Sequence, residues 1–549
     1  MVNYAINFIL ISLLIFTPIA YASMDFWAFS LMELAILFIV TLWAVQSGIV
    51  ELKRRSLVSG PQAPQSPIPN PQSVLGIHPS SIDNHQSDLR TPNSELRTPR
   101  SAFGTQSSIV NHQSSLRALN SELRTIYWVL LISFLCLIIF QMIPLPSGVV
   151  KILSPKNYEL RNFLLAGSST PSSALSAGSS SFSSTFYLQP SSYFPLSLVP
   201  FATQMEFFKW LALAGLFLFL LRWDFLQKKS RGLNRFLLVL FLVGVLESLY
   251  GMFEAFSGHN QSLNIKLDDS SVAGTFISRN YFAGYLLMVI PLSIGYLLSR
   301  RENQVLRFGG WRYWLASLHG KSLLVGFGIV VMILALLFSA SRMGIASLLF
   351  SCGLTSLLLR NIQGERRASR VPVVVLVLAL LWAGWIGLDA VIGRFFTSSD
   401  DFKMRWMTWV DTFRILKDFP LFGSGLGTFA MVFPIYRSFH LVQMTDHAEN
   451  DFLQLASEVG LVGAGLLLIL LVAFFYKAVS GIRSLPEGDR NRYVGIGGLV
   501  GILALMSHSL VEANIQIPAN AFLFTFILGT VLRLPDISKS DHRPYMSMR

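Results

Sequence analysis

The sequence contains little charge and almost no cysteine. Only 13% of its 549 residues are Asp, Glu, Lys or Arg, about half the share found in an ordinary soluble domain. Cys136 and Cys352 are its two cysteines, too few for a disulfide framework or a cysteine-ligated metal site. Hydrophobic residues make up 52% of the chain, so a soluble globular domain and a disordered chain are both excluded.

Long apolar runs are what the sequence has in abundance. Runs of about 18 residues recur along most of the chain, and each is long enough to cross ~30 Å of hydrocarbon as a helix. The predicted fold is therefore all-α, a polytopic membrane protein. We expect twelve transmembrane helices, at residues 3–22, 27–49, 126–143, 205–221, 236–256, 280–299, 322–339, 344–359, 371–390, 458–476, 493–512 and 518–532.

The net charge of +13 follows from the membrane topology. If the N-terminus is cytoplasmic, the cytoplasmic segments hold 30 of the 43 Lys and Arg residues, as the positive-inside rule requires. The basic charge therefore gives no reason to expect a nucleic-acid partner. Ala20-Tyr21-Ala22 resembles a signal-peptidase site, but no basic residue precedes the apolar run, so we expect an uncleaved first helix.

The spans divide the chain into five parts. These are two N-terminal helices at 1–50, a polar insert at 51–125, helices 3–9 with a Ser-rich outside loop (145–204) at 126–390, a large outside loop at 391–457, and the last three helices with a cytoplasmic tail at 458–549. The insert repeats SSIxNHQS (residues 80–87 and 107–114) after 27 residues and has no apolar face to stack, so we expect it to be disordered and cytoplasmic.

The outside loop 391–457 has an amphipathic pattern. A helix at 402–419 would place one apolar face along the membrane interface rather than cross it. That face consists of Phe402, Trp406, Trp409, Val410, Phe413 and Leu416. Pro420 and the glycines at 423, 425 and 427 are expected to end the helix and form a turn.

Two arginines of the outside face lie in unusual places. Arg342 closes the four-residue hairpin SASR between two spans, and Arg405 lies on the amphipathic helix. One interpretation is that each arginine caps a helix end or extends to the lipid headgroups. The alternative is that both bind a diphosphate, because a guanidinium matches phosphate oxygens bidentately and keeps its charge.

The stretch TDHAENDFLQLASEVG, residues 445–460, gathers titratable groups at the start of a helix that we expect near Asp446. Asp446 and Glu449 have the spacing of a capping box. His447 or Glu449 at this position is equally suited to remove a proton from a sugar hydroxyl. Further on, His508 and Glu512 are one helical turn apart, which favours a satisfied internal pair over a proton relay.

Several of these motifs occur together and in order. They are QMIPLPSGVVKILSP from Gln141, GTFISRNYFAGYLLMVIPLSIG from Gly274, LFSASRMGIASLL from Leu337, RWMTWVDTFRILKDFPLFGSGLGTFAMVFPIYR from Arg405, HAENDFLQLASEVGLVGAGLL from His447 and SHSLVEANIQIPANAFLFTFILG from Ser507. Together they resemble the O-antigen ligase and polymerase superfamily of bacterial envelope glycosyltransferases, well over roughly residues 270–532 and loosely before that.

The resemblance implies an inverting glycosyltransferase of the inner membrane, with both termini cytoplasmic, a periplasmic site, and neither metal nor cofactor. The donor would be a glycan linked to undecaprenyl diphosphate. The acceptor would be a hydroxyl of lipid A-core for a ligase, of a growing repeat unit for a polymerase, or of a protein.

The resemblance also assigns residues. Arg342 and Arg405 would attend the diphosphate, and the position where many relatives carry the functional His is Glu449 here. Either Glu449 is the base, or His447 replaces it, or the activity is altered. The substrate-binding candidates of second rank are Arg279, Asn280, Arg437 and Asn450.

Two other classes of function remain open. Twelve spans with both termini inside also suit a secondary transporter, and Glu33, Glu247, Glu254 and Glu512 are acidic residues within the predicted spans. A non-catalytic partner of an envelope polymerase is the third possibility, and the replaced His is its one indication.

Overall fold

The structure is a computed structural model. It describes residues 2–58, 125–168, 192–222, 230–257, 261–262, 265–266, 271–300, 320–362, 366, 368–387, 399–439 and 445–542. One compact unit comprises Met1–Trp43 with Tyr127–Arg549, and the other comprises Ala44–Ile126. Most of the predicted polar insert, including its repeat, lies outside the described residues; in the second unit α2 continues as a helix to Val58. The site described below belongs wholly to the first unit.

The described chain contains eleven helices that are long and apolar enough to cross a membrane, which confirms an all-α polytopic membrane protein. They are α1 (Val2–Ile19), α2 (Phe26–Val58), the helix Thr125–Met142, α6 (Pro200–Arg222), α8 (Ser230–Ser257), α9 (Arg279–Ser299), α12 (Gly320–Phe338), α13 (Arg342–Arg360), α14 (Val371–Ile386), α18 (Asp451–Arg483) and α20 (Pro518–His542).

The twelfth expected span is α19 (Arg490–His508), a helix that is not among these eleven and that has Arg490, Asn491 and Arg492 in its first turn. Two of its glycines face α9 at close range: a Cβ at Gly501 would lie 2.9 Å from the Met288 carbonyl oxygen, and one at Gly497 would collide with the Pro291 carbonyl. Small residues let membrane helices approach this closely. Because α19 is buried against protein rather than lipid, it needs less apolar surface than its neighbours.

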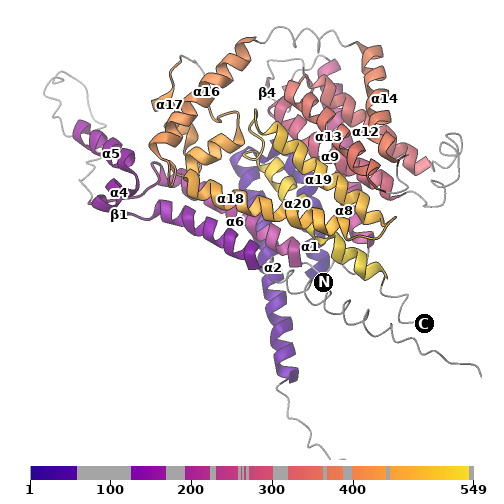
Figure 1. The fold of residues 1–549 in the computed structure, drawn as a ribbon, viewed down its shortest axis with the longest axis horizontal. Helices are drawn as coiled ribbons and strands as arrows, with labels where there is room; N and C mark the ends of the chain where they lie inside the picture. The colour runs from indigo at the N-terminus through magenta and orange to yellow at the C-terminus, as the bar shows by residue number, and fades with distance from the viewer. Residues whose placement is uncertain are drawn as a thin grey trace, which may run out of the picture. The chain divides into compact units, whose positions relative to one another are not determined.

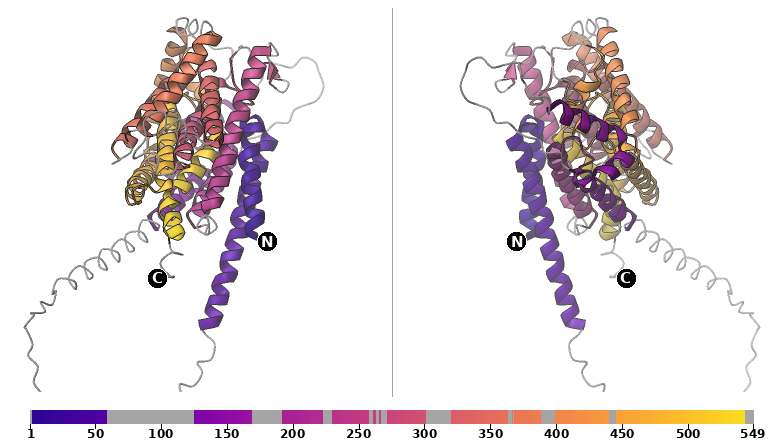
Figure 2. Two further views of the ribbon diagram at one scale, coloured as in Figure 1. Left: turned by 90° about the vertical axis from the view of Figure 1, so that its right-hand side faces the viewer. Right: turned by 90° about the vertical axis from the view of Figure 1, so that its left-hand side faces the viewer.

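Helix α9 lies at the centre of the first unit, and its span is completely buried. It packs against α8, α12, α13, α19 and α20 (Figures 1 and 2), and Tyr285 and Tyr296 are among the largest side chains buried there. The ends of α9 are therefore held by several helices at once, which makes its first turn a rigid place for a site.

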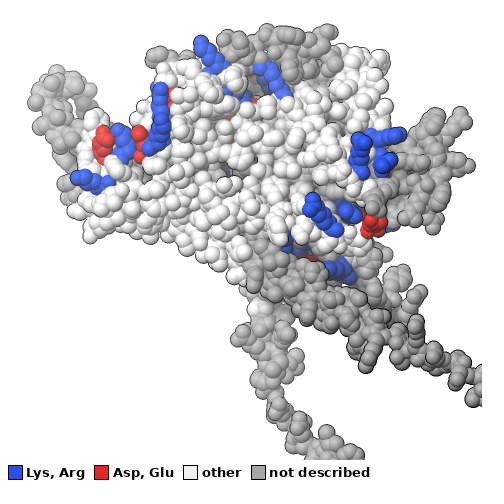
Figure 3. All heavy atoms as spheres, viewed as in Figure 1, with Lys and Arg blue, Asp and Glu red and all other residues white. Residues whose placement is uncertain are grey.

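The surface of the helices is mostly uncharged. In the face shown in Figure 3, Lys and Arg form only small groups on a white surface. Large apolar side chains are exposed instead, for example Phe8, Leu246, Phe253 and Leu468. So much exposed apolar surface favours contact with lipid rather than with water.

The predicted outside loop 145–204 contains short elements of its own. They are β1 (Leu145–Pro146), which pairs with β2 (Tyr193–Phe194), and the helices α4 (Ser147–Leu153) and α5 (Pro155–Ser168). Asn157 and Arg161 of α5 donate hydrogen bonds to the carbonyls of Leu196 and Ser197, each at 2.7 Å. The Ser-rich centre lies outside the described residues. Another small pair, β3 (Gln261–Ser262) with β4 (Ile265–Lys266), follows α8.

The predicted outside loop 391–457 contains α16 (Ser399–Asp418) and α17 (Phe429–Tyr436). The predicted amphipathic helix is confirmed as a helix, and Phe402, Trp406 and Phe413 are exposed on it. The predicted glycine turn is confirmed as well, since Gly423, Gly425 and Gly427 all have positive φ.

This glycine loop is attached to a kink in α18. The Gly425 amide donates to the Glu458 carbonyl at 3.0 Å, and the Gly427 amide donates to the Glu458 carboxylate at 2.9 Å. Two residues further on, Gly460 has φ +67°, a left-handed conformation that interrupts the helix. The glycine loop thus fixes the position of the first turns of α18 and of the residues directly before this helix.

The expectation that this helix begins near Asp446 is wrong. Helix α18 begins at Asp451, and its N-cap is Asn450, whose side chain accepts a hydrogen bond from the Leu453 amide at 3.0 Å. Glu449 lies before the cap with φ +53°. The capping box between Asp446 and Glu449 therefore does not form, and Glu449 is free of that structural role.

Candidate functional site

The starts of α9 and α13, the end of α19 and the segment between α19 and α20 meet near one end of α9. A Cβ at Gly344 in the first turn of α13 would lie 2.9 Å from the Cβ of Ala283 in α9. The absence of a Cβ at Gly284 leaves room for the Asn514 side chain, from the segment between α19 and α20. Ser507 near the end of α19 donates to Ser347 of α13 at 2.9 Å. Residues from distant parts of the sequence are thus brought together here.

Arg342 occupies the first helical position of α13. The predicted hairpin is confirmed: α12 ends at Phe338, Ala340 has φ +51°, and the Ser341 hydroxyl caps α13 by accepting from the Gly344 amide at 3.3 Å. The first turn of α13 contains no acidic residue. A helix N-terminus carries partial positive charge, and Arg342 adds a full charge to it.

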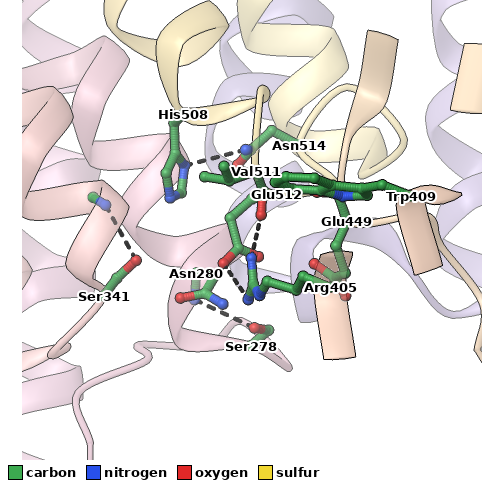
Figure 4. A network of polar contacts seen from close by, with 11 residues as sticks. Ser278, Asn280, Ser341, Arg405, Trp409, Glu449, His508, Val511, Glu512 and Asn514 are labelled. Carbon is green, nitrogen blue, oxygen red and sulfur yellow. Dashed lines mark hydrogen bonds and ion pairs between the residues drawn. The ribbon is translucent and has the colours of Figure 1, made fainter. Parts of the chain in front are cut away.

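Arg279 and Asn280 begin α9 in the same way. The Ser278 hydroxyl accepts from the Asn280 amide at 3.3 Å, and the first turn of α9 also has no acidic residue. Figure 4 shows the Asn280 side chain near the Arg405–Glu512 pair, with Ser341 on the other side of the group. Two helix N-termini that each carry an arginine therefore adjoin, an arrangement that attracts anions.

Arg405 of α16 forms an ion pair with Glu512 of the segment between α19 and α20. The distance from Nη2 to the Glu512 Oε1 is 2.6 Å, and Nη1 also donates to the Val511 carbonyl. The Arg405 side chain is 25% exposed and that of Glu512 only 5%. The guanidinium therefore reaches from the surface of the site to a buried carboxylate.

Glu449 lies beside this pair (Figure 4), and its carboxyl is close enough to form a hydrogen bond with Glu512. Burial raises the pKa of Glu512, Arg405 opposes this effect, and the neighbouring Glu449 carboxylate raises that pKa further. Trp409 holds the Glu449 backbone by donating from Nε1 to its carbonyl at 3.2 Å. A non-glycine residue at positive φ has a strained backbone, and such residues occur often at functional sites, where the surrounding structure fixes the direction of the side chain.

His447 has a different set of neighbours. Burial lowers the pKa of its imidazole, Glu449 and Asp446 raise it, and Lys209 of α6 lowers it further. Its Nδ1 has no hydrogen-bond partner among the described residues. The carboxylate that reaches the Arg405–Glu512 pair is that of Glu449, so the two candidates for the base are not equivalent in geometry.

Asn450 and Arg437 have structural contacts. The Asn450 side chain caps α18. Arg437 is the C-cap of α17, and the next residue, Ser438, donates from its amide and hydroxyl to Asp411 of α16 at 2.8 and 2.9 Å. Asp411 is six residues beyond Arg405, roughly 9 Å along the helix axis. Arg437 is thus not among the residues gathered in Figure 4.

The expected pair of His508 and Glu512 does not form. Helix α19 ends at His508, so Glu512 is no longer one helical turn away. His508 Nδ1 is 3.1 Å from Asn514 Nδ2, while Glu512 pairs with Arg405. The contact between Asn514 and His508 was not predicted from the sequence. The one signal for it was the place of Asn514 in the SHSLVEANIQIPAN motif.

A cavity of about 370 Å³ opens next to this site. Apolar side chains of the helix Thr125–Met142, α6, α18 and α20 line most of it, and Asp451 and Gln516 belong to its few polar residues. Asp451 also accepts hydrogen bonds from the Asn514 and Ile515 amides, each at 2.8 Å. The apolar cavity therefore adjoins the segment that carries Glu512 and Asn514.

The fold and the site define a polytopic α-helical membrane protein in which Arg405 and the carboxylates of Glu449 and Glu512 lie close together, in the neighbourhood of an apolar cavity. Across the described ranges no three His, Cys, Asp or Glu side chains lie together in a way that would hold a metal ion.

The chain can be assigned more closely by comparison. Residues 327–468 match the model of the O-antigen ligase family, and the match confirms for this segment the resemblance to the O-antigen ligase and polymerase superfamily. The segment includes Arg342, Arg405, His447 and Glu449. No curated protein was found to match the chain. Within these residues the chain is therefore similar to the O-antigen ligase family.

Proposed function

We propose that the protein transfers a glycan from undecaprenyl diphosphate to a sugar hydroxyl, with inversion and without a metal ion. The observation that supports this most is the cluster of Arg405, Glu512 and Glu449 beside the first turns of α9 and α13. Positive groups and a carboxylate base are what this reaction needs at adjacent positions.

In this proposal the diphosphate is bound by the two helix N-termini with Arg279, Asn280 and Arg342, and by Arg405. Backbone amides at a helix N-terminus and guanidinium groups both bind phosphate oxygens. Arg405 turns from Glu512 to the diphosphate when the donor binds.

Glu449 then removes the proton of the acceptor hydroxyl. The hydroxyl oxygen forms a bond to the anomeric carbon as the bond from this carbon to the diphosphate oxygen breaks. The electron pair leaves with the diphosphate, whose growing charge the arginines stabilise. A single displacement of this kind inverts the anomeric carbon. Glu449 is preferred to His447 because it contacts the Arg405–Glu512 pair.

The apolar cavity supports a lipid-linked donor. It is lined by side chains from predicted spans and adjoins the charged cluster at Asp451, so a polyprenyl chain in the bilayer has a route to the site. The charge distribution of the loops supports a site on the periplasmic face of the inner membrane. In this proposal Asn450 and Arg437 do not bind the substrate directly. They fix the conformation of the segment between α17 and α18, since Asn450 caps α18 and Arg437 is the C-cap of α17.

Two of the four acidic residues that suggested a transporter have local partners. The Glu247 carboxylate accepts from the Thr275 amide and hydroxyl at 2.9 to 3.0 Å, where it holds the segment before α9, and Glu512 pairs with Arg405. Carboxylates that are held by local partners favour an enzyme over a proton-coupled carrier.

The test is glycan transfer in proteoliposomes that contain a polyprenyl-diphosphate-linked donor and an acceptor glycan. Arg342→Ala should reduce turnover at least about a hundredfold, because a group that stabilises developing charge is lost. Lys417→Ala is the matched control, since Lys417 is an exposed cation of α16 that lies over the Phe413 ring. Full turnover by the Arg342 variant would refute the assignment of the diphosphate site.

A further inference from the structure

His508 is a buried residue of the site that has no role in the mechanism above. It is the last residue of α19, and none of its surface is exposed. Figure 4 shows its ring between Ser341 on one side and the Arg405–Glu512 pair on the other, with the free edge toward Asn280. The ring therefore borders the same space as the proposed diphosphate ligands.

Asn514 determines which ring nitrogen carries the proton. Its Nδ2 lies 3.1 Å from His508 Nδ1. With the Asn514 amide in this orientation its NH₂ donates, so Nδ1 accepts and the proton is on Nε2. Asn514 is itself held in place, because its backbone amide donates to Asp451 and its side chain occupies the space that Gly284 leaves.

The Nε2 atom of His508 is buried and has no hydrogen-bond partner among the described residues. Buried polar groups in native proteins nearly always have a partner, and an exception points to a ligand or a water molecule. Because this nitrogen carries a proton, the missing partner must be an acceptor such as an oxygen atom. The same tautomer excludes a role as general base, which would need a lone pair on Nε2.

We infer that His508 is a fixed neutral donor that hydrogen-bonds through Nε2 to an oxygen of the donor diphosphate. This inference rests on the proposed function. The arginines at the first turns of α9 and α13 attract the anion, and the His508 ring lies between Ser341, the N-cap of α13, and the Arg405–Glu512 pair (Figure 4). A neutral N–H fixes the orientation of the diphosphate and adds no charge to a site that already contains three arginines.

The test compares three substitutions in nanodiscs that contain the full chain. The amide nitrogen of Gln reaches about as far as Nε2 of His, whereas that of Asn reaches only as far as Nδ1. His508→Gln should therefore retain the affinity for undecaprenyl diphosphate within a few fold. His508→Asn and His508→Ala should each weaken it about ten- to hundredfold, as expected for the loss of a hydrogen bond to a charged group. Undecaprenol, which has no phosphate, is the control ligand and should show no difference among the variants.

The outcomes separate the inference from the proposed function. If the wild-type protein binds undecaprenyl diphosphate no better than undecaprenol, the proposed function fails. If it binds the diphosphate better and the Asn variant matches the wild type, only the role of His508 is refuted. Loss of transfer in the Gln variant with normal affinity would mean that His508 acts as a base, which also refutes the inference.

A measurement on the wild type avoids any effect of substitution on folding. In the protein labelled with ¹⁵N-histidine, solid-state NMR should show a neutral ring at position 508 with the proton on Nε2. The Nε2 signal should shift when undecaprenyl diphosphate is added, and undecaprenol should leave it unchanged. A signal that is the same with both ligands would mean that Nε2 binds only a water molecule, and the inference would be wrong.

Discussion

Substitution of Arg405 should separate its structural role from its proposed role at the diphosphate. Arg405→Ala leaves Glu512, which is 5% exposed, without its ion-pair partner. Breaking a buried pair in this way costs about 3–5 kcal/mol of stability. We expect the lower end of that range, since the Arg405 side chain is 25% exposed and solvent screens part of its charge.

The double variant Arg405→Ala/Glu512→Gln should regain most of this loss. The buried amide of the Gln side chain at position 512 needs hydrogen bonds but no opposite charge. The double variant should therefore be about 2 kcal/mol more stable than Arg405→Ala alone, a coupling energy typical of residues in contact. Unfolding midpoints in one detergent, measured for the wild type, both single variants and the double variant, give the coupling energy.

Activity should not follow stability in this series. If Arg405 binds the diphosphate, the double variant folds but still fails to transfer glycan in proteoliposomes. Recovery of transfer together with stability would contradict the role of Arg405 at the diphosphate. A double variant no more stable than Arg405→Ala would contradict the importance of the ion pair itself.

Three further predictions concern the loop before α18 and its kink. Glu449→Gln should reduce turnover by about 10²–10⁴, as expected for a general base, whereas His447→Gln should reduce it by less than about tenfold; the opposite order in a transfer assay would assign the base to His447. Burial lowers the pKa of His447, so below about pH 6.5 the unfolded chain binds more protons than the folded one, and stability falls with falling pH by up to about 1.4 kcal/mol per unit. Unfolding midpoints at pH 7.5 and 5.5 should therefore differ less in His447→Gln than in the wild type, and equal differences would be inconsistent with a buried neutral ring. Gly460→Ala should destabilise the chain by at least about 2 kcal/mol, because Gly460 has φ +67° and its Cβ would collide with the Leu421 carbonyl, while Gly465→Ala in the same helix meets no atom within 4 Å and should be neutral or slightly stabilising by thermal unfolding.

The transmembrane helices could be predicted because a span depends on local composition. An apolar run of sufficient length is stable in lipid only as a helix, whatever its neighbours are. Helix α19 is the informative exception, since it is buried among other helices and two of its glycines face α9. Its apolar character is set by a contact with another helix, which local composition does not describe.

The side-chain partners were harder to predict. His508 and Glu512 have the spacing of one helical turn, but the helix ends between them and the chain turns Glu512 toward Arg405. Glu449 has the spacing of a capping box with Asp446, but the cap forms at Asn450 instead. In both cases the prediction assumed that the helix continues, and tertiary contacts determined where it begins or ends.

The sequence alone determined that this chain crosses a membrane many times, which segments cross it, and which arginines lie at their ends, because these properties depend on residues that are neighbours in the chain. Only the tertiary structure decided that Arg405, Glu449 and Glu512 adjoin one another, and that Asn514 rather than Glu512 is the partner of His508. These residues are up to about a hundred positions apart. Their contacts exist because small residues such as Gly344 and Gly284 let α9, α13 and the segment after α19 approach closely.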